Sequence, residues 1–66
     1  MASFSAIFVK VDGLAEELGA IRQLDAESLN EAQAEILAWP EADRQGANMI
    51  DIYRDGYKVF RLGVDL

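Results

Sequence analysis

The chain has 66 residues, and its twelve acids against six bases give a net charge of −6 at pH 7. This length makes one domain, residues 1–66, which buries only about 60% of the surface that the unfolded chain exposes. The chain has no cysteine and no histidine, which excludes disulfides and the usual zinc sites and fits a reducing compartment. Its stability must then come from a second subunit or from an unusually good core.

The amino terminus, MASFSAIFVKVDG, has no basic segment and only a brief apolar run, unlike a secretory signal peptide. No stretch reaches the roughly eighteen apolar residues that a membrane-spanning helix needs. We therefore expect a cytoplasmic protein with no membrane partner.

Residues 3–11, SFSAIFVKV, are rich in aromatic and β-branched residues and predict a first strand. The next residues, DGLAEE, predict a turn or loop. A tight turn at Asp12-Gly13 is an alternative, but LAEE is poor in strand formers and favours a longer connection. Residues 18–25, LGAIRQLD, predict a second strand, although Gly19 weakens its interior.

The segment AESLNEAQAEILAWP predicts a helix. Ser28 and Glu31 form a capping box, in which each side chain bonds the backbone amide of the other residue. A broad apolar stripe at helical spacing follows, made of Leu29, Ala32, Gln33, Ile36, Leu37 and Trp39, with Glu31, Glu35 and Ala38 facing the other way. Pro40 ends this helix or starts a further turn, PEADRQ, that Gly46 would close.

Residues 49–64, MIDIYRDGYKVFRLGV, predict a hairpin about a type I′ turn at Asp55-Gly56. The expected pairs are Arg54 with Tyr57, Tyr53 with Lys58, Ile52 with Val59, and Asp51 with Phe60. The fold class is therefore α+β, with the order ββαββ: a four-stranded antiparallel sheet and one helix.

Both faces of this hairpin are apolar. Alternation places Ile50, Ile52, Tyr57 and Val59 on one face, edged by Arg54 and Arg61, and Met49, Tyr53, Phe60 and Leu62 on the other, with Asp51 and Lys58. A single helix covers only one face of a sheet. The second face is closed by curling of the sheet, by a second copy, or by another protein, and exposed apolar patches favour a partner.

The inventory of side chains argues against an enzyme and against any cofactor. Without histidine, cysteine or threonine, no nucleophile has a matching base, and a domain this small is not expected to build a groove for paired carboxylates. No phosphate-binding glycine pattern and no EF-hand spacing occurs. We expect no catalytic residue and no metal ligand.

Two charged surfaces remain as candidates. The hairpin interleaves aromatic and basic residues as a nucleic-acid-binding ribbon would, but the net charge of −6 opposes binding to a polyanion. Glu27, Glu31 and Glu35 are spaced by four, with Glu41 and Asp43 beyond, and such a row could imitate phosphates in an arginine-lined groove. The commoner explanation of the row is a solvated helix face.

The order of a hairpin ending in LDAESLNEAQAEI, one helix, and a YRDGYKVFRL hairpin resembles two groups of proteins. One is a set of small uncharacterised bacterial ββαββ domains, and the other is the small acidic phage-encoded anti-CRISPR proteins. The likeness spans most of the chain, and its motifs are a capping box and a turn. It implies a stoichiometric inhibitor that binds a CRISPR effector in the host cytoplasm and blocks its nucleic-acid path.

The sequence thus predicts a non-enzymatic protein-binding module that acts by occlusion. The expected contact residues are Glu27, Glu31, Glu35, Met49, Tyr53, Phe60 and Leu62. The main alternative is a homodimeric accessory protein whose sheets stack back to back. A nucleic-acid-binding hairpin is the third hypothesis.

Overall fold

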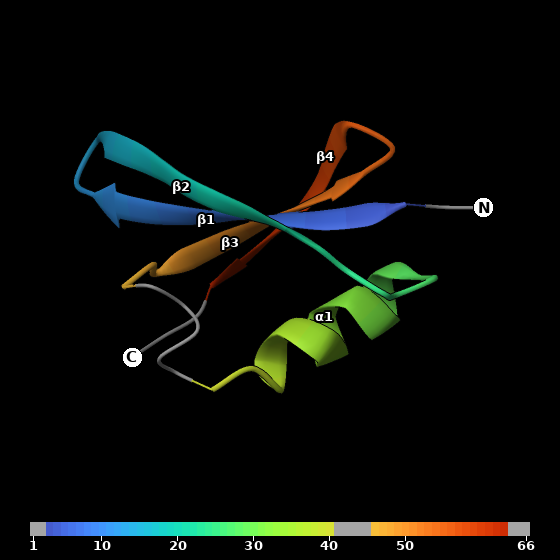
Figure 1. The fold of residues 1–66 in the computed structure, drawn as a ribbon. Coiled ribbons are helices and arrows are strands. Elements are labelled where there is room, and N and C mark those ends of the chain that lie inside the picture. Colours follow the sequence, from blue (N-terminus) through green and yellow to red (C-terminus); the bar gives the residue numbers. More distant parts are fainter. Residues whose placement is uncertain (1–2, 41–45, 64–66) are drawn as a thin grey trace.

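The sheet consists of four antiparallel strands with one helix against it. The computed structural model of the protein describes residues 3–40 and 46–63. The strands lie side by side in the order β2-β1-β3-β4, and α1 covers one face (Figure 1). This confirms the predicted α+β class and the ββαββ order. The elements are β1 (Phe4–Asp12), β2 (Ala15–Gln23), α1 (Leu29–Leu37), β3 (Met49–Arg54) and β4 (Tyr57–Gly63).

The helix connects two strands that are not neighbours. β2 and β3 both pair antiparallel with β1, so they run parallel to one another on either side of it. The unit β2-α1-β3 is therefore a split β-α-β motif with β1 in its gap. This connection leaves β2 and β4 as the two edges of the sheet.

The first hairpin is tighter than the sequence predicted. β2 begins at Ala15 rather than at residue 18, and Asp12 pairs with Ala15 across a two-residue turn, Gly13-Leu14. Gly13 has a φ of 63°, which suits the first central position of a type II′ turn. The expected longer connection is wrong because pairing with a central strand outweighs the weak strand propensity of LAEE.

Gly19 marks an irregularity in this hairpin. The register shifts between the pairs Ile7↔Ile21 and Val9↔Leu18. A Cβ atom added at Gly19 would lie 3.3 Å from the carbonyl oxygen of Phe8. The glycine is thus explained by a close approach of two backbones, which a larger residue would force apart.

The second hairpin has the predicted turn but a different register. Asp55 and Gly56 have φ values of 50° and 90°, as a type I′ turn requires. The first two predicted pairs are present, and then the register shifts by one residue, so that Ile52 pairs with Phe60 and Asp51 with Arg61. The predicted pairs of Ile52 with Val59 and Asp51 with Phe60 are wrong because a β-bulge in β4 inserts an extra residue.

The bulge exchanges the faces of the second half of β4. Residues directly opposite each other in an antiparallel pair share a face. Phe60 and Leu62 therefore lie on the helix side with Ile52 and Ile50, and Leu62 packs against the core. The prediction that Phe60 and Leu62 share a face with Met49 is wrong for the same reason.

The hydrophobic core lies between α1 and one face of the sheet. From α1 it takes Ala32 and Ile36, which are four residues apart and fully buried. Leu37, which the predicted stripe included, is 57% exposed, because it lies about 100° further round the helix than Ile36. The other buried members come from the sheet and the flanking loops: Phe4, Ala6, Phe8, Leu24, Ala26, Trp39, Ala47, Ile50 and Ile52.

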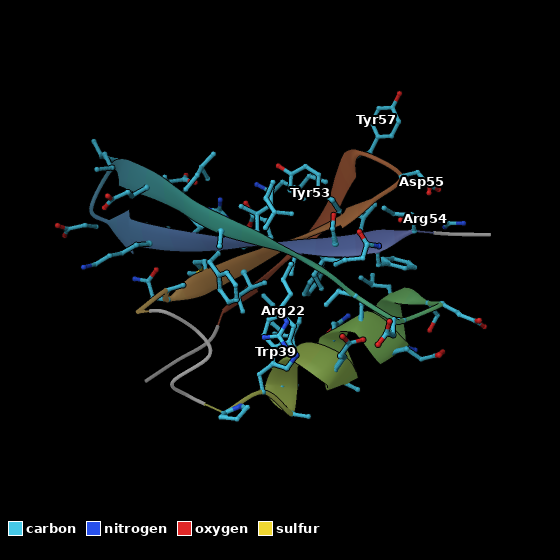
Figure 2. The ribbon with its side chains drawn as sticks, viewed as in Figure 1. Arg22, Trp39, Tyr53, Arg54, Asp55 and Tyr57 are labelled. Carbon is cyan, nitrogen blue, oxygen red and sulfur yellow. The ribbon has the colours of Figure 1, made fainter. Side chains whose placement is uncertain are left out.

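Side-chain contacts fix both ends of the helix. The Glu31 amide donates to the Ser28 hydroxyl at 3.2 Å, which confirms Ser28 as the N-cap. Beyond the last turn, the Trp39 ring lies 5.7 Å from the Phe8 ring, and the Arg22 guanidinium lies 4.4 Å from the Trp39 ring centre (Figure 2). The stack joins β2 to the end of the helix. The turn predicted over PEADRQ lies largely outside the described residues.

Candidate functional site

The face of the sheet turned away from α1 is the candidate site, and we call it the open face. Among residues 3–40 and 46–63, no element lies over it (Figure 1). The strand pairings bring together alternate residues of all four strands. These residues are Ser5, Ile7, Val9, Val11, Glu16, Leu18, Ile21, Gln23, Met49, Asp51, Tyr53, Lys58 and Arg61.

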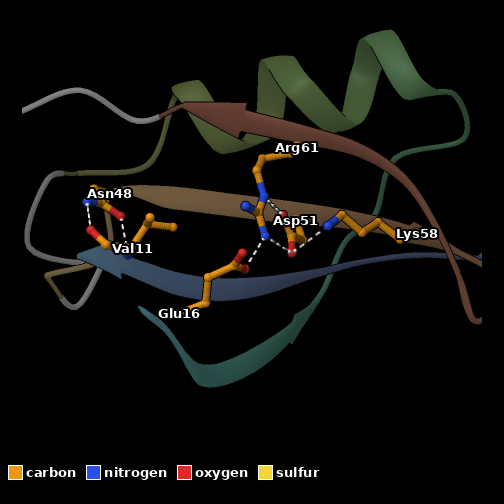
Figure 3. A network of polar contacts seen from close by, with 6 residues as sticks. All are labelled: Val11, Glu16, Asn48, Asp51, Lys58 and Arg61. Carbon is orange, nitrogen blue, oxygen red and sulfur yellow. Dashed lines mark hydrogen bonds and ion pairs between the residues drawn. The ribbon is translucent and has the colours of Figure 1, made fainter. Parts of the chain in front are cut away.

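An ion network crosses the open face (Figure 3). Arg61 of β4 donates to both carboxylate oxygens of Asp51 in β3, at 2.7 and 3.1 Å. The same guanidinium donates to the carboxylate of Glu16 in β2 at 2.6 Å. The Lys58 Nζ atom lies 3.4 Å from Oδ2 of Asp51, diagonally across the hairpin. The network therefore links the two edge strands over the central pair.

Hydrogen bonding favours the ionised forms of Asp51, Glu16 and Arg61. The hydrogen bond from Arg61 lowers the pKa of Asp51 and outweighs the opposing effect of burial. The hydrogen bond from Arg61 also lowers the pKa of Glu16, and the two carboxylates together raise the pKa of Arg61. Asp51 is only 3% exposed, so its charge needs these partners. Two acids and two bases cancel, which leaves the face without net charge.

The apolar side chains of the open face are unevenly covered. Val9 alternates with Phe8 and so points away from the core, yet it is 0% exposed. Leu18 and Ile21, its neighbours on β2, are 67% and 70% exposed. The middle of the face is thus closed to solvent, whereas its β2 side is open.

Asn48 anchors the start of β3 beside this face. Its side-chain amide donates to the Val11 carbonyl oxygen, and its side-chain oxygen accepts from the Val11 amide, both at 2.8 Å (Figure 3). The side chain thus adds two hydrogen bonds between β1 and the residue that precedes β3. Sequence reasoning missed this role, because an asparagine before a strand carries no signal of its distant partner.

The predicted contact residues do not form one surface. Met49 and Tyr53 lie half-buried on the open face, whereas Phe60 and Leu62 lie on the helix side. Glu27 and Glu31 are exposed around the start of α1. Glu35 is half-buried, and its carboxylate accepts from the Asp25 amide at 3.1 Å.

Sequence reasoning did not assign Glu16, Leu18, Ile21 or Arg61 to the site, although they supply much of its ion network and its most exposed apolar side chains. The first three belong to β2, whose early start was not predicted. Strict alternation from Ala15 onward would have placed Glu16 and Leu18 together. Arg61 was placed on the opposite face because the bulge in β4 leaves no mark in the sequence.

Two hollows on the surface of the described residues lie beside the sheet. One, of about 220 Å³, is lined by Phe8, Lys10, Glu17, Leu18, Gly19 and Ala47. The other, of about 250 Å³, is lined by Phe4, Glu27, Ser28, Leu29, Arg54 and Val59. Within the described part of the chain, no group of three acidic residues could hold a metal ion, and no helix could span a bilayer.

Fold and site together define an α+β protein with one helix-covered sheet face and one open face. No family model matches the chain, and neither curated proteins nor solved structures give a significant match.

Proposed function

We propose that the protein is a non-enzymatic binding module for another polypeptide, and that the open face is its contact surface. The observation that carries this proposal is the exposure of Leu18 and Ile21, at 67% and 70%, on a face that no described element covers. Burying each such side chain is worth roughly 1.5–3 kcal/mol. Exposed apolar side chains that gather on one face are typical of protein interaction sites.

The surroundings of Leu18 and Ile21 support the same proposal. Both side chains stand on β2, which is paired to the central strand β1, so the strand that presents them is already formed before a partner binds. The neighbouring charges are already bonded to one another. A partner would therefore contact apolar side chains next to charged groups that already bond one another. Few polar groups without a bonding partner would lose their water when it binds.

The test compares three immobilised forms of the protein: the natural chain, Ile21→Lys and Leu37→Lys. Leu37 is also exposed, at 57%, but lies on the helix. We expect any specific partner to be lost by Ile21→Lys and kept by Leu37→Lys, and hydrogen exchange in the purified complex to protect β1 and β2. Equal retention by all three forms would reject the open face as the contact surface.

We further propose that an inhibitor of a nucleic-acid-binding complex, such as a CRISPR effector, is the narrower form of this function. The resemblance to anti-CRISPR proteins supports it. So does the position of the charge, since the acidic excess of the described residues lies off the neutral open face. Of the predicted acidic row, Glu27 and Glu31 are exposed, whereas Glu35 is engaged by the Asp25 amide.

This narrower function is tested in a target-binding assay with a purified CRISPR effector. If charge mimicry operates, the natural chain reduces DNA binding by the effector and the double variant Glu27→Lys, Glu31→Lys does not. The double variant Asp12→Lys, Glu17→Lys, which reverses two exposed acids on β1 and β2, is the matched control for net charge. Inhibition that survives the double variant would exclude the acidic row as the contact.

A further inference from the structure

We infer that the partner of the open face is a second copy of this chain, so that two sheets stack with their open faces together. This inference rests on the proposed function, since it names the occupant of the same surface.

The placement of charge favours a copy of the same chain over other occupants. Two copies that each carry −6 repel wherever their acidic surfaces meet. On the open face, Glu16 and Asp51 are balanced by Arg61 and Lys58. This face therefore lets two copies approach closely without a net repulsion between the touching surfaces. A strongly charged foreign partner would gain no attraction there.

The size of the molecule fits such a contact. Its principal extents are 35 × 24 × 16 Å, so one broad side of the molecule is large enough for the roughly 800 Å² that each partner buries in a stable interface. The chain has no cysteine, and a domain of this size commonly gains stability by oligomerisation. Stacking would supply the cover that the open face lacks.

The position of Leu18 and Ile21 indicates how the copies are arranged. Both lie on β2, at one side of the face, and the ion network occupies the middle. A two-fold axis that runs across the strands puts β2 over β2 of the second copy, so apolar side chains meet apolar ones. The other in-plane axis would place β2 over β4, with Leu18 and Ile21 against Lys58 and Arg61.

The absence of cysteine in the natural chain allows a direct test of this arrangement. Ile21→Cys and Leu37→Cys each introduce one thiol at an exposed position. We expect light scattering to give the natural chain twice its mass of 7.3 kDa, and a short bismaleimide to link Ile21→Cys, but not Leu37→Cys, into a covalent dimer. Equal linking of both variants, or a natural chain that stays monomeric when concentrated, would overturn the inference.

A weakened variant separates the inference from the proposed function. Ile21→Lys should reduce self-association by at least about tenfold, because it removes two symmetric apolar contacts. If the natural chain is monomeric and binds a different protein through Ile21, the inference of a second copy is wrong and the proposed function stands. A monomeric chain whose contacts are all insensitive to Ile21→Lys would overturn both.

Discussion

The guanidinium of Arg61 in β4 donates to both carboxylate oxygens of Asp51 in β3, at 2.7 and 3.1 Å. The two residues face each other across the hairpin because of the bulge in β4. The Arg61 charge compensates the buried charge of Asp51, and the pair contributes to the zero net charge of the open face.

Asp51→Ala should destabilise the fold. The carboxylate is 3% exposed, and a hydrogen bond to a charged group contributes about 1.5–3 kcal/mol. We expect the free energy of unfolding in urea to fall by about that amount. Asp25→Ala, at an exposed position in the loop before α1, is the control and should change it much less. Equal effects of the two substitutions would contradict the role of the network.

Acid should weaken the fold through the same network. The pKa values of Asp51 and Glu16 lie below their ordinary values of 3.8 and 4.5 in the folded protein, so the unfolded chain binds more protons as the pH falls. The stabilisation is present above those ordinary values and is lost as the pH drops through the lower folded ones. Urea unfolding at a series of pH values measures this loss. Asp51→Asn should make the free energy of unfolding depend less on pH below about pH 4. An unchanged pH dependence would count against the prediction.

Asn48→Ala should loosen the start of β3. The substitution removes both 2.8 Å hydrogen bonds to the Val11 backbone, each worth about 0.5–1.5 kcal/mol. We expect faster hydrogen exchange at the Val11 amide and lower stability in urea. Asn30→Ala, on the exposed side of α1, serves as the control. The prediction fails if exchange at Val11 is the same in both variants.

The β3–β4 hairpin should not bind nucleic acid. Two of its three bases, Lys58 and Arg61, are engaged by Asp51 and Glu16, and the chain carries −6 overall. We expect no mobility shift of a labelled single-stranded oligonucleotide at low salt. A salt-sensitive shift that disappears with Arg54→Ala and Arg61→Ala would restore the nucleic-acid hypothesis.

Several elements could be predicted from the sequence because their signals are local. The Ser28 cap, the Asp55-Gly56 turn and the alternation of β1 each depend on residues within a few positions of one another. The ββαββ order follows from these elements. The alternation of apolar residues in the β3–β4 hairpin also predicted that the helix leaves one face of the sheet uncovered.

The register and the composition of the open face were decided only by the tertiary structure. The bulge in β4 moves Phe60 and Leu62 to the helix side and Arg61 beside Asp51. The tight turn at Gly13-Leu14 brings Glu16 within 2.6 Å of Arg61, which is distant in the chain. Because a side chain changes face with every shift of one residue, pairing between distant strands, and not local preference, determined which residues form the site.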